Sequence, residues 1–156
     1  MKVLHKKSGD LREAVIELVE GGDWDAIGKS KKFGFRWMNE KGYIVYKIRL
    51  AKEEEILGLI SLEDIPKELR IHVRLIEVNS ENIGENKKYD RIAGCLFAFT
   101  CRLAFKKKYE GYVSLYSKTE LIEHYKKKYG FREFGMNLYT ELTNSERLIK
   151  KYLGNG

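Results

Sequence analysis

The sequence has only one proline, Pro66, only two cysteines and no low-complexity tract. This composition excludes a collagen-like fibre and a set of modules joined by proline-rich linkers. The longest apolar run, residues 92–100, is far shorter than the ~20 residues that cross a bilayer. The basic N-terminus also lacks the apolar segment of a signal peptide. We therefore expect a cytoplasmic protein that does not interact with a membrane.

The two cysteines and three histidines form no recognisable ligand pattern. Cys95 and Cys101 are six residues apart in one apolar segment. In a helix this spacing separates them by about 9 Å along the axis, which exceeds the reach of a disulfide. We expect both thiols to be reduced and buried, as in a reducing compartment. His5, His72 and His124 are scattered, so the sequence predicts no metal site.

The proportions of hydrophobic and charged residues suit a single domain over residues 1–156. Hydrophobic residues make up 43% and charged residues 34% of the chain, enough apolar material for one core beneath a highly charged surface. The formal net charge is +7. That charge is compatible with nucleic acid, with acidic substrates or with a phosphorylated cofactor, and it does not choose among them.

The first half of the chain shows two kinds of periodicity. Apolar residues at helical spacing predict an amphipathic helix over residues 11–19. Residues 23–42 are interpreted as a loop or a short strand. Alternation of apolar side chains predicts strands at residues 43–50 and 56–62, joined by a charged turn.

A third strand, residues 71–78, has an irregular apolar pattern. Ile71, Val73 and Leu75 alternate, but the apolar phase then shifts to Ile76 and Val78. Such a shift indicates a bulge or a splay that turns the backbone away from a neighbouring strand. The alternative is a strand that is buried on both faces.

The second half of the chain alternates strands and helices. In order, the pattern predicts a polar loop (79–90), a mostly apolar central helix (91–105), a strand (111–116), a helix (117–130), one or two strands (131–142) and a last helix (144–153). Ser117–Glu120 resembles a capping box, and Gly130 ends the helix that it opens. The whole order predicts an α+β fold, a mixed sheet flanked by helices, with parallel pairing across the strand–helix–strand passages.

The start of the central helix is a candidate anion site. A helix N-terminus has unpaired N–H groups and partial positive charge, which suits phosphate. Here it carries Lys87, Lys88 and Arg91, with the small residues Ala93 and Gly94 allowing a ligand close to the backbone. The alternative is an ordinary loop whose lysines are solvated.

The residues around this helix start resemble the phosphate motif of the GNAT superfamily of acyl-CoA-dependent N-acyltransferases, Gln/Arg-x-x-Gly-x-Gly/Ala. Two registers are open: Lys88-x-x-Arg91-x-Ala93, which we favour, and Arg91-x-x-Gly94-x-Leu96. The favoured register starts the helix where the apolar periodicity starts.

Four further segments resemble GNAT elements, and together the resemblance covers roughly residues 40–141. They are the third strand (55–62), the fourth strand (75–78), the fifth strand (111–115) and the Tyr-x-x-x-Gly-Phe element (123–131). The loop after Val78 is longer than usual and contains Asn82 and Asn86, as in a GNAT subset. Tyr125 lies five residues before Gly130 instead of four, about 100° of helical rotation from the family position, which Lys126 occupies.

The resemblance implies an N-acetyltransferase that transfers an acetyl group from acetyl-CoA to a primary amine, directly in a ternary complex. The acceptor would be an amine-bearing small molecule, a protein or an aminoacyl-tRNA. Glu77 is the candidate base and Tyr125 the candidate acid, although a surface glutamate and a packing tyrosine are the alternatives. The coenzyme would be bound by Ile76, Val78, Lys88, Tyr89, Asp90, Arg91, Ile92, Ala93, Gly94 and Ser117.

A second hypothesis rests on the basic stretch between Arg102 and Lys128. It contains eight Lys/Arg and three Glu, beside several tyrosines. Such a face can hold RNA through phosphate contacts and base stacking. The chain would then be a basic RNA-binding or aminoacyl-tRNA-directed module on a GNAT-like fold. The sequence leaves a homodimer open.

Overall fold

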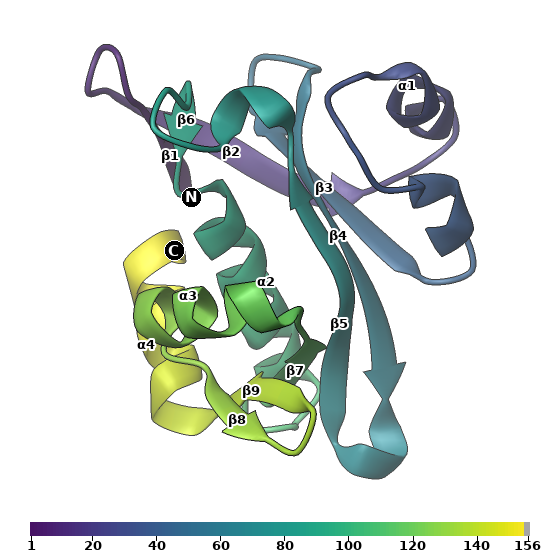
Figure 1. The fold of residues 1–156 in the computed structure, drawn as a ribbon, viewed down its shortest axis with the longest axis vertical. Helices are drawn as coiled ribbons and strands as arrows, with labels where there is room; N and C mark the ends of the chain where they lie inside the picture. The colour runs from purple at the N-terminus through teal and green to yellow at the C-terminus, as the bar shows by residue number, and fades with distance from the viewer. Residues whose placement is uncertain (155–156) are drawn as a thin grey trace.

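The computed structural model describes residues 1–154, which form a nine-stranded mixed sheet with four α-helices (Figure 1). The strand order is β6-β1-β2-β3-β4-β5-β7-β9-β8. The strands are β1 (Lys2–His5), β2 (Leu11–Leu18), β3 (Ile44–Leu50), β4 (Ile56–Ile65), β5 (Arg70–Val78), β6 (Tyr89–Asp90), β7 (Val113–Tyr116), β8 (Arg132–Phe134) and β9 (Asn137–Thr140). Only β5 and β7 pair in parallel among these strands.

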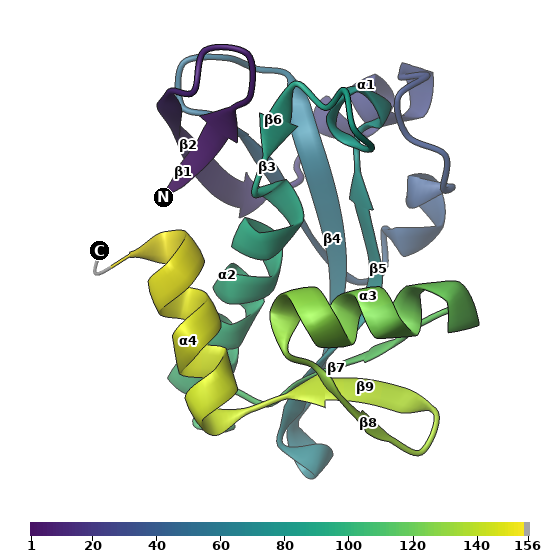
Figure 2. The same ribbon diagram turned by 60° about the vertical axis from the view of Figure 1, so that its left-hand side comes forward.

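Helices cover both faces of the sheet. They are α1 (Asp23–Lys29), α2 (Ile92–Lys106), α3 (Thr119–Tyr129) and α4 (Leu142–Leu153), with short 3-10 turns at Trp37–Glu40, Pro66–Glu68 and Ser80–Asn82. Figures 1 and 2 show α2, α3 and α4 on one side of the sheet and α1 on the other. In the described residues, no helix combines the length and apolar character that a bilayer crossing demands.

Each face of the sheet has its own core. The larger core lies beneath α2 and α4 and includes Leu96 and Phe97, both fully buried. The smaller one lies beneath α1 and the Trp37–Glu40 turn, where Trp37 contacts the cluster around Leu59. The α2 helix is buried on most sides, as its apolar pattern predicts. Cys95 and Cys101 lie within it, and both are buried and unpaired.

Several sequence predictions are wrong, and the first is the helix over residues 11–19, which is strand β2. Ala14 and Ile16 alternate toward the larger core, while Glu17, on the other face, pairs with Arg49. Val15, between Ala14 and Ile16, completes an apolar pattern that matches helical spacing by chance. Strand β1 was not predicted, and residues 23–42 contain α1 and a 3-10 turn instead of a strand.

Two predictions about the second half are also wrong. The capping box does not form: Lys118 is the N-cap residue of α3, and Ser117 Oγ donates to Lys118 O. The passage through α3 yields no parallel pair, because β7 pairs antiparallel with β9. The strands at 43–50, 56–62, 71–78 and 111–116, the helix α2 and the end of α3 at Gly130 (φ +73°) are confirmed. The last helix is confirmed and begins two residues early.

The irregular strand contains the predicted bulge. Leu62 pairs with Val73 and Ser61 with Leu75, so Arg74 is the extra residue in β5. The bulge moves Ile76 to the face of the larger core and Leu75 to the smaller one. The shift of apolar phase in the sequence therefore marks a real change of face, and β5 is not buried on both faces along its length.

Candidate functional site

Strands β5 and β7 separate at the bulge. Their parallel ladder joins Ile71–Val73 to Val113–Leu115 and ends there. On its other edge β5 remains paired with β4 as far as Val78. Since Asn79 N donates to Leu57 O across that paired edge, strand alternation directs the backbone groups of Ile76 and Val78 into the gap. The sheet therefore has an internal edge with hydrogen-bonding capacity, in its middle.

A pocket of about 410 Å³ lies in this gap, and we call it the gap pocket. Its walls come from β5, from β7, from α3 and from Phe35 of the opposite layer. Ser117 and Tyr125, both predicted as site residues, line it. The Tyr125 ring stands edge-on to Phe97, 5.7 Å between centroids, and burial raises the pKa of its hydroxyl. Tyr125 is therefore protonated at neutral pH and available as a donor.

A second pocket, of about 210 Å³, lies at the start of α2, and we call it the helix-start pocket. The first intrahelical bond runs from Cys95 N to Arg91 O, so the amides of Ile92, Ala93 and Gly94 have no acceptor within the helix. Val78 lines this pocket and Ile76 lines the gap pocket, so the free edge of β5 connects the two.

The helix-start pocket has more positive than negative charge. Lys87 lines it from the loop before β6, and Lys128 lines it from α3. Burial, together with Lys128 and Lys87, lowers the pKa of His124, so this lining residue is neutral at pH 7. Burial opposes the charge of Asp90, but the Arg91 N–H bond and the two lysines outweigh it and lower the pKa of Asp90. Asp90 is thus an anion held at the turn before the helix.

A glycine contact brings the start of α2 close to the sheet. A Cβ at Gly58 of β4 would lie 2.8 Å from Ile92 Cγ2, so a larger residue would displace the Ile92 side chain or the helix that carries it. The glycine therefore allows the start of α2 to pack closely against β4.

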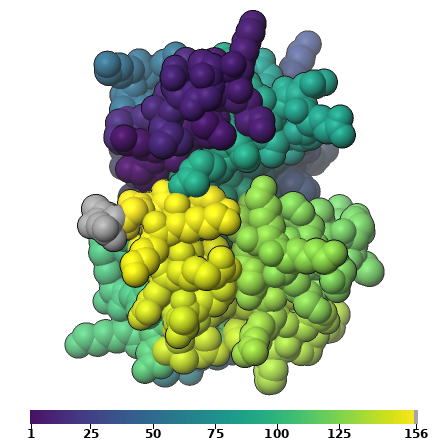
Figure 3. All heavy atoms as spheres, turned by 90° about the vertical axis from the view of Figure 1, so that its left-hand side faces the viewer, coloured from purple at the N-terminus to yellow at the C-terminus, as the bar shows by residue number. Residues whose placement is uncertain are grey.

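Arg91 has an unusual backbone conformation and a structural side chain. Its φ of +78° is left-handed, as glycine would adopt, and the favoured register places a motif glycine there. The guanidinium donates to Lys2 O at 3.3 Å and Lys151 O at 2.7 Å and lies over the Tyr152 ring. Figure 3 shows the N-terminal strands (purple) next to α4 (yellow) on one face of the molecule. The Arg91 side chain is thus engaged within the protein.

Three predicted coenzyme residues, Tyr89, Ile92 and Gly94, are buried, and two of them, Gly94 and Tyr89, pack against aromatic or imidazole rings of the fold. A Cβ at Gly94 would overlap the Tyr152 ring, so its small size serves the contact between α2 and α4 rather than access for a ligand. Tyr89 is 2% exposed, with its ring 5.2 Å from that of His5. Lys88 is exposed beside it.

A buried amide network shapes the loop before α2. Asn82 Nδ2 donates to Asn79 Oδ1 at 2.6 Å, and Asn82 Oδ1 accepts from Tyr89 N at 2.8 Å. Asn79 in turn donates to Ile56 O of β4. These side chains therefore attach the loop to the sheet. In the sequence pattern they were identifiable only as turn-forming residues.

Glu77 is held by the layer on the other face of the sheet. Its two carboxylate oxygens accept from Gly34 N at 2.6 Å, Phe35 N at 3.2 Å and Trp37 Nε1 at 2.8 Å. Since Glu77 alternates with Ile76 and Val78, its side chain leaves the strand on the face of the smaller core. The predicted base is therefore engaged with backbone and indole donors.

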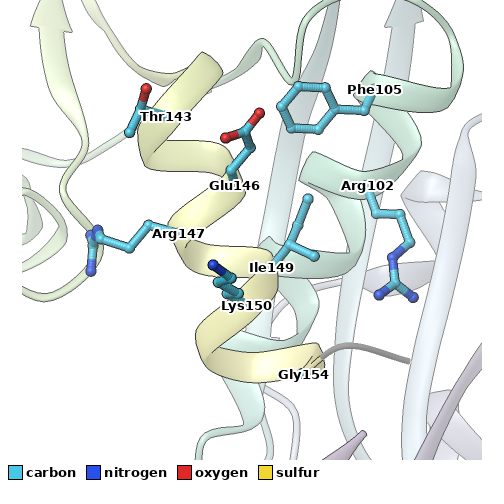
Figure 4. A pocket seen from close by; sticks show the side chains of 8 residues that line it. All are labelled: Arg102, Phe105, Thr143, Glu146, Arg147, Ile149, Lys150 and Gly154. Carbon is cyan, nitrogen blue, oxygen red and sulfur yellow. The ribbon is translucent and has the colours of Figure 1, made fainter.

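A larger hollow, about 710 Å³, lies elsewhere, in an open groove between α2 and α4 (Figure 4). Arg102 and Phe105 line it from α2, and Glu146, Ile149 and Lys150 from α4. It contains neither a strand edge nor helix-start amides. No group of three His, Cys, Asp or Glu side chains suited to a metal ion occurs in residues 1–154.

The structure resembles solved acetyltransferases. A chimera of spermidine N-acetyltransferase SpeG from Vibrio cholerae and hSSAT superposes with a TM-score of 0.63 at 14% identity, over 88% of this chain and 98% of that one. The AtaT toxin bound to acetyl-CoA and the C-terminus of the antitoxin AtaR gives 0.60 at 14%, over 88% and 99%. Nourseothricin acetyltransferase gives 0.55 at 12%, over 83% and 97%. No protein-family model matches the sequence, and no curated protein matches it.

Proposed function

Since the chain has the GNAT fold, we propose that it is an N-acetyltransferase that transfers an acetyl group from acetyl-CoA to a primary amine in a ternary complex. The observation that carries the proposal is the free edge of β5, which leads from the gap pocket to the amides at the start of α2. An edge of this kind holds an extended ligand, and the helix start holds the phosphates at its end.

The chain offers a suitable set of donors for the coenzyme diphosphate. The amides of Ile92, Ala93 and Gly94 point out of the first turn of α2, and Lys87 and Lys128 stand on either side. Backbone donors and ammonium groups suit a phosphate without specifying a side-chain motif. Asp90 is directed to the Arg91 N–H, which limits its repulsion of an anion.

Acyl transfer requires that charge is stabilised where it develops. The amides of Ile76 and Val78, aimed into the gap, are donors for the thioester oxygen. Tyr125, a protonated phenol whose pKa burial raises further, is the acid for the departing thiolate. Holding the amine beside the thioester accounts for most of the acceleration, and the amine proton leaves through water.

Isothermal calorimetry with acetyl-CoA tests the proposal. We expect binding, a rise in Tm with ligand, and weaker binding of about tenfold when Lys87 and Lys128 are both replaced by glutamine. Lys127→Gln is the matched control, because Lys127 is an exposed neighbour on α3 outside the pocket. If millimolar acetyl-CoA produced neither heat of binding nor a rise in Tm, the proposed enzymatic function would be rejected.

Tyr125→Phe separates chemistry from binding. Loss of the hydroxyl should lower kcat by roughly a hundredfold while the Kd for acetyl-CoA stays within twofold, about the scale of a lost general acid. Unchanged kcat would exclude Tyr125 as the acid and leave solvent in that role.

A second candidate is transfer to an amine linked to RNA. The chain has a net charge of +7, and AtaT, similar in fold, has been solved with acetyl-methionyl-tRNAfMet. Lys127 and Lys128 extend the positive rim of the helix-start pocket along α3. RNA binding that weakens steeply with salt would support this candidate. No binding at low salt would exclude it.

A further inference from the structure

The Glu77 clamp holds an aromatic side chain at the gap pocket. We use this name for the three bonds from Gly34 N, Phe35 N and Trp37 Nε1 to the Glu77 carboxylate. Trp37 is 1% exposed and anchors the segment around Phe35 in the smaller core, whereas Phe35 is 45% exposed and lines the pocket. Half-exposed phenylalanine at a pocket wall is apolar surface available to a ligand.

A second anchor holds the same segment a few residues further on. Glu40, only 5% exposed, accepts from Ser61 Oγ at 2.8 Å and Arg74 Nε at 2.9 Å. Arg74, the bulge residue, also stacks on the Tyr43 ring at 3.6 Å. The segment is therefore attached to β4 and β5 at two points, and Phe35 is presented on a rigid element.

The charge around the gap pocket disfavours a polycationic acceptor. Among the described residues that line it, Glu120 is the one carboxylate, against the cations Arg74 and Lys118. The two nearby acids, Glu77 and Glu40, are already paired within the protein. A second ammonium group on an acceptor would find no buried anion here.

We propose that the acceptor is a monoamine with an apolar or aromatic flank, and that Glu77 is a positioning residue that holds Phe35 against this flank. The inference rests on the proposed function. Apolar walls from Phe35, Leu75, Leu115 and Leu121 bind the flank. The carboxylate of Glu77 takes no proton from the substrate, because its oxygens serve the segment that carries Phe35.

Matched amines test the acceptor class with acetyl-CoA as donor. Hexylamine and 1,6-diaminohexane have the same chain length and differ by one ammonium group, and 2-phenylethylamine adds a ring. We expect kcat/KM for hexylamine and 2-phenylethylamine to exceed that for the diamine and for spermidine by about tenfold or more. Equal or better use of the diamine or spermidine would overturn the proposal.

Two variants test the clamp. Phe35→Ala and Glu77→Gln should each raise KM for 2-phenylethylamine by about tenfold. Both should leave the acetyl-CoA Kd and the acid limb of the kcat pH profile unchanged. Phe134→Ala is the control, because this exposed aromatic residue on β8 is outside the gap pocket. A fall in kcat with unchanged KM and a lost acid limb in Glu77→Gln would make Glu77 the base and overturn its positioning role.

Binding measured without turnover separates this inference from the proposed function. Ligand-observed NMR of each amine with coenzyme A present reports acceptor binding directly. If acetyl-CoA binds but 2-phenylethylamine does not bind better than the diamine, the acceptor class is wrong and the transferase proposal stands. If acetyl-CoA does not bind, the proposed function fails first.

Discussion

The two ends of the free edge of β5 are built from different materials. The helix-start pocket is built from backbone amides and lysines. The gap pocket is built from apolar side chains, one of which, Phe35, belongs to another layer and is held by the Glu77 carboxylate of β5. A ligand that contacts backbone tolerates many sequences, because every residue has an N–H group. A ligand that contacts side chains does not. The helix-start pocket, which we propose as the coenzyme end, is therefore recognisable by shape, whereas the gap pocket, which we propose as the acceptor end, is recognisable only by its particular residues.

Gly94→Val should break the coenzyme end most severely. The new side chain would overlap the Tyr152 ring and push α4 from α2. We expect a loss of about 3 kcal/mol in the free energy of unfolding, measured by urea denaturation. Gly28→Ala is the control, since a Cβ at Gly28 of α1 meets nothing within 4 Å. Wild-type stability in Gly94→Val would mean that the two helices are not in contact as described.

Asn82→Ala should loosen the loop that precedes the helix start. It leaves Tyr89 N without its acceptor in a buried position, for a loss of about 2 kcal/mol. Acetyl-CoA affinity should fall with it, whereas Asn86→Ala, at an exposed position, should change neither quantity. Urea denaturation and calorimetry measure the two effects. An equal response of the two variants would argue against the buried network.

Arg91 tests whether the coenzyme end depends on its backbone alone. Arg91→Ala should cost about 1.5 kcal/mol of stability through the bonds to Lys2 O and Lys151 O. Arg91→Gly should cost about 1 kcal/mol less, because glycine relieves the left-handed strain. In both variants we expect the acetyl-CoA Kd to change less than tenfold. A larger loss of affinity would indicate that the Arg91 guanidinium takes part in binding acetyl-CoA.

Asp90 gives the smallest effect, and it depends on pH. Its pKa is lower in the folded protein than in the unfolded chain, so its charge adds stability above the unfolded pKa. This contribution disappears as the pH falls through the folded pKa. Asp90→Asn should therefore be less stable than wild type at pH 7, and the two should converge in acid. Thermal denaturation between pH 7 and pH 2 measures the difference, and parallel curves would contradict it.

Local patterns in the sequence were sufficient for the strands around the gap. The change of apolar phase between Leu75 and Ile76 predicted a bulge, and the bulge marks where β7 leaves β5. The apolar coverage of residues 91–105 placed α2 in the core. Both signals arise from burial, which a periodicity reports directly.

The proposed acceptor end could not be predicted from the sequence because its contacts are long-range. Glu77 meets Phe35 across forty-two positions, and Arg74 meets Glu40 across thirty-four. Nothing in either segment indicates the other. The prediction of a helix at β2 was wrong for a related reason. Val15 and Leu18 lie at the spacing of an apolar helical stripe, but pairing with β1 and β3 makes this segment a strand.

The arginine at the start of α2 has a consequence for folding. Its guanidinium joins a carbonyl of residue 2 to one of residue 151, so these surroundings of the helix start form only when segments far apart in the sequence have come together. Contacts of such high sequence separation must first overcome the entropy of closing a long loop, so we expect this part of the fold to become ordered late.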